Sequence, residues 1–137
     1  KVGQVLIQTY YPDNPVIKAF KSGDRNSFIK QTLEERKQFN IPPFSFMTAI
    51  ILSGTSIAKV LAYAHKLVKG QILEKNIDIL GPVEAPLFLL RGRYRYRLLL
   101  KGNKRNKLNA FTRKMIENSP PPSTIRLTID VDPYTFM

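Results

Sequence analysis

Apolar and polar positions follow two different periods along the chain, and each change of period marks a new element. Nearly continuous apolar runs are typical of buried strands, whereas apolar positions three or four residues apart are typical of helices that pack on a core. The pattern after residue 43 predicts, in order, a strand at 44–52, a helix at 57–69, a short strand at 77–80, an apolar connection at 83–90, a strand at 93–101, a helix after Gly102 and a half-buried strand at 125–131.

The order of these elements, β-α-β-β-α-β, predicts an α+β domain with the architecture of a ferredoxin-like sandwich. Two βαβ halves with right-handed crossovers place both helices on one face of an antiparallel sheet. We therefore expect the first and third strands to lie at the centre of the sheet, and the face opposite the helices to stay open.

Residues 1–42 carry a different pattern and are predicted to form a separate segment. Residues 1–10 are rich in strand-forming side chains, but a single strand has no stability alone, so we expect its partner strands to lie outside this sequence. A helical turn is predicted at 16–21, and a helix that begins after Ser22 or Asp24 is predicted to end at residues 40–43. Because two prolines stiffen that joint, the predicted domains are 1–42 and 43–137.

The predicted strand at 93–101 has one basic face. Because side chains alternate along a strand, Arg93, Arg95 and Arg97 share one face, and the tyrosines and leucines between and after them share the other. Three neighbouring guanidinium groups repel one another unless an anion lies across them, and nucleic acid is the first candidate. Tyr94 and Tyr96 are predicted to pack in the core. The aromatic residues predicted to lie in loops, freer to stack on bases, are Tyr10, Tyr11 and Phe88.

The charge of the chain strengthens this interpretation. Lysine and arginine outnumber aspartate and glutamate by 22 to 10, which gives a net charge of +12 and predicts attraction to polyanions. Residues 91–114 contain ten basic residues and no acidic one, whereas an ordinary solvated surface mixes both signs. The predicted nucleic-acid contacts, mainly to the phosphate backbone, are Arg91, Arg93, Arg95, Arg97, Lys101, Lys104, Arg105 and Lys107.

No pattern of residues indicates catalysis or a metal site. Cysteine is absent and His65 is the single histidine, which excludes disulfides and argues against zinc bound by this chain. Asp130 and Asp132 would bind a metal ion only weakly. Ion pairs with nearby arginines are the simpler expectation for these two carboxylates. The sequence contains no GxxxxGK[ST] phosphate loop and no apolar run long enough to span a membrane. The residues therefore predict an intracellular chain that binds rather than reacts.

Several stretches, taken together and in order, resemble the C-terminal region of the primosomal protein N-prime (PriA) family, the replication-restart DNA helicases of bacteria. They are GQVLIQTYYPDNPVI, EERKQFNIPPFSFM, LGPVEAP, RGRYRYRLLLK and IDVDPYTFM, and they span nearly the whole chain. The resemblance implies that residues from about 43 onward form a DNA-binding domain similar in fold to a small-subunit ribosomal protein. It also implies that residues 1 to about 11 end the second helicase lobe.

The resemblance further implies that the chain is part of a larger ATP-driven 3′-to-5′ helicase. In the family, the sites for ATP, magnesium and zinc lie upstream, so no cofactor and no catalytic residue is expected here. The implied partners are single-stranded and forked DNA, the acidic tail of single-stranded DNA-binding protein, other primosome proteins and the rest of the helicase. The implied location is the bacterial cytoplasm, in association with the nucleoid.

Two other interpretations of the basic surface remain open. In the first, the domain is a protein-docking module that receives the acidic tail of single-stranded DNA-binding protein. In the second, it binds RNA, which a fold similar to that of a ribosomal protein permits. Enzymatic activity of this chain by itself is the weakest alternative.

Overall fold

The computed structural model describes residues 3–71 and 74–134. The chain divides into two compact units, Lys1–Phe39 and Asn40–Met137. This division falls a few residues before the predicted boundary between residues 42 and 43. Each unit is described by itself below.

The first unit contains two short helices with well-defined ends, α1 (Pro15–Ser22) and α2 (Arg25–Gln38). The Asn14 side chain accepts a hydrogen bond from the Val16 N–H at 2.9 Å, and that of Asp24 accepts one from the Ser27 N–H at 3.0 Å. Hydrogen bonds from Ser27 lower the pKa of Asp24, because they favour the charged carboxylate. The predicted helical turn and the predicted cap at Asp24 are therefore confirmed.

The prediction of a strand at residues 1–10 is wrong for the residues that the structure describes. Residues 3–9 adopt no regular secondary structure, and residues 1–2 lie outside the described part. The physical reason is that a strand is stabilised by hydrogen bonds to a neighbouring strand, and no described strand pairs with this segment. Its apolar side chains are consequently exposed, Leu6 to 94%.

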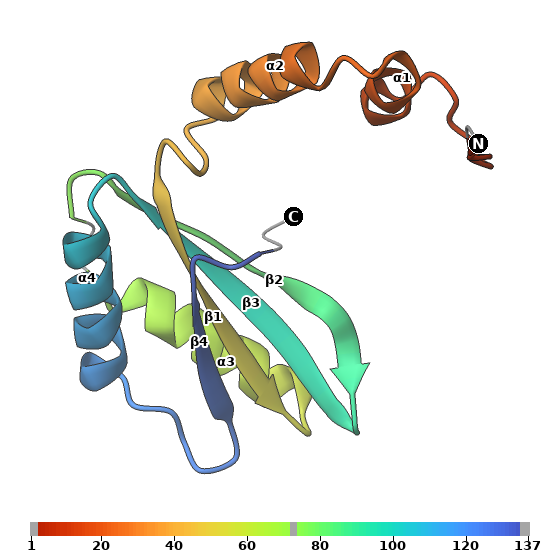
Figure 1. The fold of residues 1–137 in the computed structure, drawn as a ribbon. Helices are drawn as coiled ribbons and strands as arrows, with labels where there is room; N and C mark the ends of the chain where they lie inside the picture. Colours follow the sequence, from red (N-terminus) through yellow and green to blue (C-terminus); the bar gives the residue numbers. More distant parts are fainter. Residues whose placement is uncertain (1–2, 72–73, 135–137) are drawn as a thin grey trace. The chain divides into compact units, whose positions relative to one another are not determined.

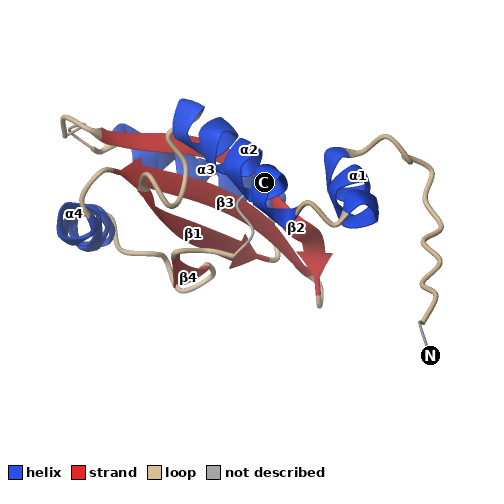
Figure 2. Cartoon of the chain, turned by 45° about the horizontal axis from the view of Figure 1, so that its top comes forward, coloured by secondary structure: helices blue, strands red, loops and turns tan. Residues whose placement is uncertain are grey.

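The second unit is a four-stranded antiparallel sheet with two helices on one face (Figures 1 and 2). The spatial order of the strands is β2-β3-β1-β4, so the first and third strands are central and the predicted ferredoxin-like architecture is confirmed. Its elements are β1 (Phe46–Gly54), α3 (Ile57–Lys69), β2 (Ile77–Leu90), β3 (Arg93–Gly102), α4 (Arg105–Asn118) and β4 (Arg126–Val131).

The main core lies between the sheet and the two helices. Alternate residues of the central strands face this core, and helical residues spaced three or four apart complete it. Its fully buried members include Ile50, Leu52, Val60, Leu67, Leu98, Leu100, Leu108 and Met115. Tyr96 packs against the same core from β3, so the prediction that it has a packing role is confirmed. On the opposite face of the sheet, Met47, Ala49 and Leu99 form a small second cluster with Ile41.

The connection predicted at residues 83–90 is in fact part of β2. This strand pairs with β3 before and after two register shifts, between Leu80 and Val83 and between Glu84 and Leu89. At the first shift, Gly81 has φ +101°, and an added Cβ would lie 2.8 Å from the Arg97 carbonyl oxygen. The sequence suggested a turn because Gly81-Pro82 interrupts the strand pattern, but bulges absorb the interruption and pairing continues.

Tyr63 joins α3 to the segment that follows α4. Its hydroxyl donates a buried hydrogen bond of 2.7 Å to the Ser119 carbonyl oxygen. Burial raises the pKa of Tyr63 because the neutral phenol is favoured away from water. This contact therefore stabilises the fold only while the phenol is protonated.

Replacing Gly81 by alanine is expected to lower the free energy of unfolding by about 3 kcal/mol or more, because the new Cβ meets both a disfavoured φ and the Arg97 carbonyl. Gly92→Ala is the matched control, since Gly92 has φ +72° but nothing within 4 Å of its added Cβ. That control should lose only about 1 kcal/mol. Urea unfolding measures both values, and equal losses would contradict the proposed clash.

Tyr63→Phe is expected to lower the free energy of unfolding by about 1–2 kcal/mol at neutral pH, because the Ser119 carbonyl loses its donor. The raised pKa of Tyr63 means that its stabilisation is fully present below the unfolded value of about 10 and is lost as the pH rises through the folded value. The stability difference between the two proteins should therefore narrow above about pH 10. A difference that stays constant with pH would show that the phenol titrates alike in both states.

Candidate nucleic-acid interface

The three alternating arginines of β3 lie on the sheet face opposite the helices. Leu98 and Leu100 enter the core under the helices, so Arg97 and the arginines two and four residues before it face the other side. In register with them on β1 are Ile51, opposite Arg97, and Ser53, opposite Arg95. The neighbours of the three guanidinium groups are therefore supplied by several strands.

Each of these arginines also has a structural role. Arg93 donates from Nη2 to the carbonyl oxygens of Ser53, at 2.8 Å, and Thr124, at 3.4 Å. Arg95 donates from Nη1 to the carbonyl oxygens of Pro86, at 2.9 Å, and Leu87, at 3.4 Å. Arg97 is only 8% exposed, which leaves little of it for a ligand. The sequence predicted the correct face for these three residues. It did not indicate that Arg93 and Arg95 bind backbone carbonyls or that Arg97 is buried.

A hollow of about 240 Å³ lies at the hairpin end of this face, and we call it the arginine pocket. All of its charged lining residues are arginines, and neither an aspartate nor a glutamate lines it. Such a concentration of positive charge favours an anion with several acceptor oxygens, because guanidinium groups bind phosphate and carboxylate in a forked geometry. The lining residues come from all four strands: Ile51, Ser53, Leu90, Arg91, Arg93, Arg95, Arg126 and Thr128.

Sequence reasoning missed Arg126 and Thr128. The strict alternation of residues 125–131 already placed both on the polar face of the last strand. What the sequence lacked was the register, in which Arg126 pairs with Ser53 and Thr128 with Ile51. Only this register shows that β4 adds a guanidinium group to the pocket formed by β3 and the hairpin.

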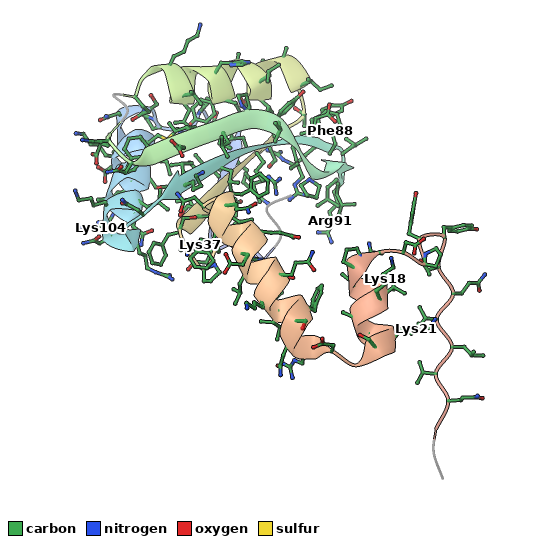
Figure 3. The ribbon with its side chains drawn as sticks, turned by 90° about the horizontal axis from the view of Figure 1, so that it is seen from above. Lys18, Lys21, Lys37, Phe88, Arg91 and Lys104 are labelled. Atoms are coloured by element: carbon green, nitrogen blue, oxygen red, sulfur yellow. The ribbon has the colours of Figure 1, made fainter. Side chains whose placement is uncertain are left out.

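The remaining predicted residues lie at the other end of the sheet. Figure 3 shows Arg91 at one end and Lys104 at the other. Lys101 Nζ is 3.4 Å from an Asp78 carboxylate oxygen, so its charge is partly compensated. Lys104 and Lys107 are exposed on the first turn of α4. The predicted basic residues therefore divide into two groups, one at each end of the sheet, and the arginine pocket is the group that gathers around one hollow.

Arg105 and Asp132 are accounted for by contacts within the domain. Arg105 forms an ion pair with Asp132, and its guanidinium carbon lies 4.9 Å from the centre of the Phe46 ring. His65 is exposed on α3. Among the described residues, no group of three or more histidine, cysteine, aspartate and glutamate side chains lies close enough together to hold a metal ion.

Phe88 does not lie in a loop as predicted. It belongs to β2, where its ring centroid lies 5.5 Å from those of both Tyr94 and Tyr96. These three rings pack together behind the hairpin, so Phe88 is held in place rather than free to stack on a base. Tyr10 and Tyr11 are exposed outside regular secondary structure.

The fold and this surface define a class of protein, a ferredoxin-like α+β domain with an arginine-lined hollow on the helix-free face of its sheet. More specifically, the chain belongs to the PriA family: the family model described as "Primosomal protein N C-terminal domain" matches residues 37–134. Replication restart protein PriA of Rickettsia conorii is 42% identical over 98% of this chain, and that of Synechocystis sp. is 36% identical over 97%. Replication restart protein PriA of Bacillus subtilis is 28% identical over the whole chain.

The chain spans only a part of these relatives, covering 20% of the Rickettsia conorii protein, 16% of the Synechocystis protein and 18% of the Bacillus subtilis protein. The predicted family membership is thereby confirmed, and with it the placement in the C-terminal region. In the described part of the chain, no helix is both long enough and apolar enough to cross a membrane.

Arg93→Ala is expected to lower the free energy of unfolding by about 2 kcal/mol, because two backbone carbonyls lose a charged donor. Arg126→Ala is the control from the same pocket, and it should change stability by no more than about 0.5 kcal/mol, because Arg126 is exposed. Chemical denaturation of both variants measures the difference. Equal effects would mean that the contacts of Arg93 to Ser53 and Thr124 do not hold the domain together.

Proposed function

We propose that this chain is the DNA-binding C-terminal domain of a replication-restart helicase, and that the arginine pocket holds phosphates of single-stranded or forked DNA. One observation carries the proposal: four arginines from two strands and a hairpin turn line one hollow on the helix-free face, with no acidic residue among its lining. Membership of the PriA family makes DNA, rather than another polyanion, the ligand of choice.

Two of the four arginines are the best candidates for direct contact. Arg91 and Arg126 are exposed, and neither side chain has a hydrogen-bond or ion-pair partner among the described residues. Arg93 and Arg95 are already held by backbone carbonyls, so they add fixed positive charge at the base of the site. A preoriented charge of this kind loses little side-chain entropy when the ligand binds.

In this proposal, the contacts are to the sugar–phosphate backbone and therefore select DNA structure rather than sequence. The domain performs no chemistry. In the parent protein, ATP, magnesium and zinc would be bound by upstream domains, and the domain would work beside the helicase lobes, other primosome proteins and single-stranded DNA-binding protein. Its place in the cell would be the cytoplasm, on the nucleoid.

A second candidate function is docking of an acidic peptide, such as the tail of single-stranded DNA-binding protein. It is favoured by the N-terminal end of α4, where Lys104 at the N-cap and Lys107 are exposed and no acidic residue lies in the first turn. A carboxylate-rich peptide would suit the two lysines and the positive end of the helix dipole. This surface is distinct from the arginine pocket, so one chain has room for both ligands.

The test is a double charge reversal, Arg91→Glu with Arg126→Glu, assayed by fluorescence anisotropy against single-stranded DNA. Binding of the native chain should weaken with salt along a log–log slope of about −3 to −4 if about four to six phosphates are neutralised. The variant should bind at least about tenfold more weakly at low salt, and its slope should be shallower by about 1.4. The matched control is Lys66→Glu with Lys69→Glu on exposed positions of α3, which makes the same change in net charge and should retain most of the affinity.

Retained affinity in the pocket variant would contradict the proposal. A labelled acidic peptide ending in an aromatic residue, and single-stranded RNA of equal length, complete the assay. Peptide binding that exceeds DNA binding at the same salt would make docking the principal function. Tighter binding of RNA than of DNA would instead identify an RNA-binding domain.

A further inference from the structure

The arginine pocket carries four full positive charges that no acidic side chain of its lining offsets. Arg93 and Arg95 donate to backbone carbonyl oxygens, which carry no net charge. Arg91 and Arg126 are exposed, and none of the ion pairs among the described residues involves an arginine of the pocket. The pocket therefore offers a ligand more positive charge than a single negative charge can balance.

Arg91 occupies a backbone position that arginine seldom adopts. Arg91 and Gly92 form the two-residue turn between β2 and β3, with φ +50° and +72°. Turns with positive φ at both positions favour asparagine, aspartate or glycine, because longer side chains are disfavoured in the left-handed region. The geometry of the turn therefore does not account for an arginine, whereas its place in the lining of the pocket does. Strain of this kind is characteristic of functional sites.

On the helix-free face, the pocket is separated from the other basic residues. Its lining comes from all four strands, so the pocket spans the width of the sheet. Along β3, the next side chains on this face are Arg97, which is largely buried, and Leu99, which belongs to the small apolar cluster. Beyond them, Lys101 is paired with Asp78. The pocket is thus a site for one anionic group rather than a section of a continuous basic track.

We propose that the arginine pocket binds a terminal phosphate, the monoester at the end of a DNA strand, in preference to the diesters within the strand. The inference rests on the proposed function and names the group that the pocket selects. A monoester carries about two negative charges at neutral pH and has three free oxygens, whereas each diester of the backbone carries a single charge. Guanidinium forks therefore gain both charge and hydrogen-bond acceptors from the monoester.

The test compares single strands of about 16 nucleotides that differ only at their ends, with hydroxyl groups at both, a 5′-phosphate or a 3′-phosphate. Each strand competes with a labelled strand in fluorescence anisotropy near neutral pH. At least one phosphorylated strand should bind about tenfold more tightly than the hydroxyl strand, the gain expected from an added charge-assisted hydrogen bond. The end that gives this gain is the end that the pocket recognises.

A hydroxyl strand that is two nucleotides longer is the control for total charge. It has the same charge as a phosphorylated strand, but its extra phosphates are diesters, so it should gain less than about twofold. Arg91→Gln with Arg126→Gln should reduce the preference for the terminal phosphate to less than about twofold. The matched control, Lys66→Gln with Lys69→Gln on exposed positions of α3, should keep the native preference.

The preference should also depend on pH. It should weaken below about pH 6, where the monoester gains a proton and loses its second charge. The lining of the pocket contains no histidine, aspartate or glutamate, so the ligand phosphate is the group that titrates there. A preference that stays constant through this range would contradict recognition of the doubly charged monoester.

The outcomes separate this inference from the proposed function. Equal binding of phosphorylated and hydroxyl strands would overturn the inference, even when Arg91→Glu with Arg126→Glu abolishes binding of both. If that charge-reversal variant binds every strand as tightly as the native chain, the proposed function itself fails. A preference that survives in Arg91→Gln with Arg126→Gln would place the terminal phosphate outside the pocket. A free 5′-mononucleotide that competes as well as the phosphorylated strand would identify a nucleotide site instead of a strand-end site, and would also overturn the inference.

Discussion

The second unit depends on the register of β3 between its two neighbours. Pairing with β1 and β2 directs Leu98 and Leu100 into the core and the alternate arginines to the opposite face. A slip of one residue would place guanidinium groups against Ile50 and Leu52 and expose the leucines, which no contact in the domain would offset. The free energy that buries the core therefore also fixes where the charge lies.

The arginines of the pocket hold the fold together with the same groups that give the hollow its charge. Arg93 and Arg95 donate to carbonyl oxygens of β1, of β2 and of the segment before β4, and these contacts anchor the backbone on both sides of β3. A backbone carbonyl compensates a guanidinium group only in part, because it carries a partial rather than a full negative charge. The pocket therefore keeps its positive potential while its geometry is held.

Much of the fold was predictable because its signals are local. The alternation in residues 93–101 and 125–131 and the helical stripes over α3 and α4 gave the order of elements, and the order gave the central strands. Two predictions failed because their answer was not local. Whether residues 3–9 form a strand depends on a partner strand, and no described strand pairs with them; whether β2 continues past Gly81 depends on pairing with β3. The pocket was predictable only in part for the same reason, since Arg126 joins it through register alone.

Because the lining of the arginine pocket is drawn from β1, the β2–β3 hairpin and β4, no contiguous piece of the chain contains it. Arg126 and Thr128 join the pocket only when β4 pairs with β1, and β4 begins more than 70 residues after β1 ends. During synthesis, most of this domain would therefore leave the ribosome before the hollow is complete. Closure of this hollow is a late event of folding in this architecture.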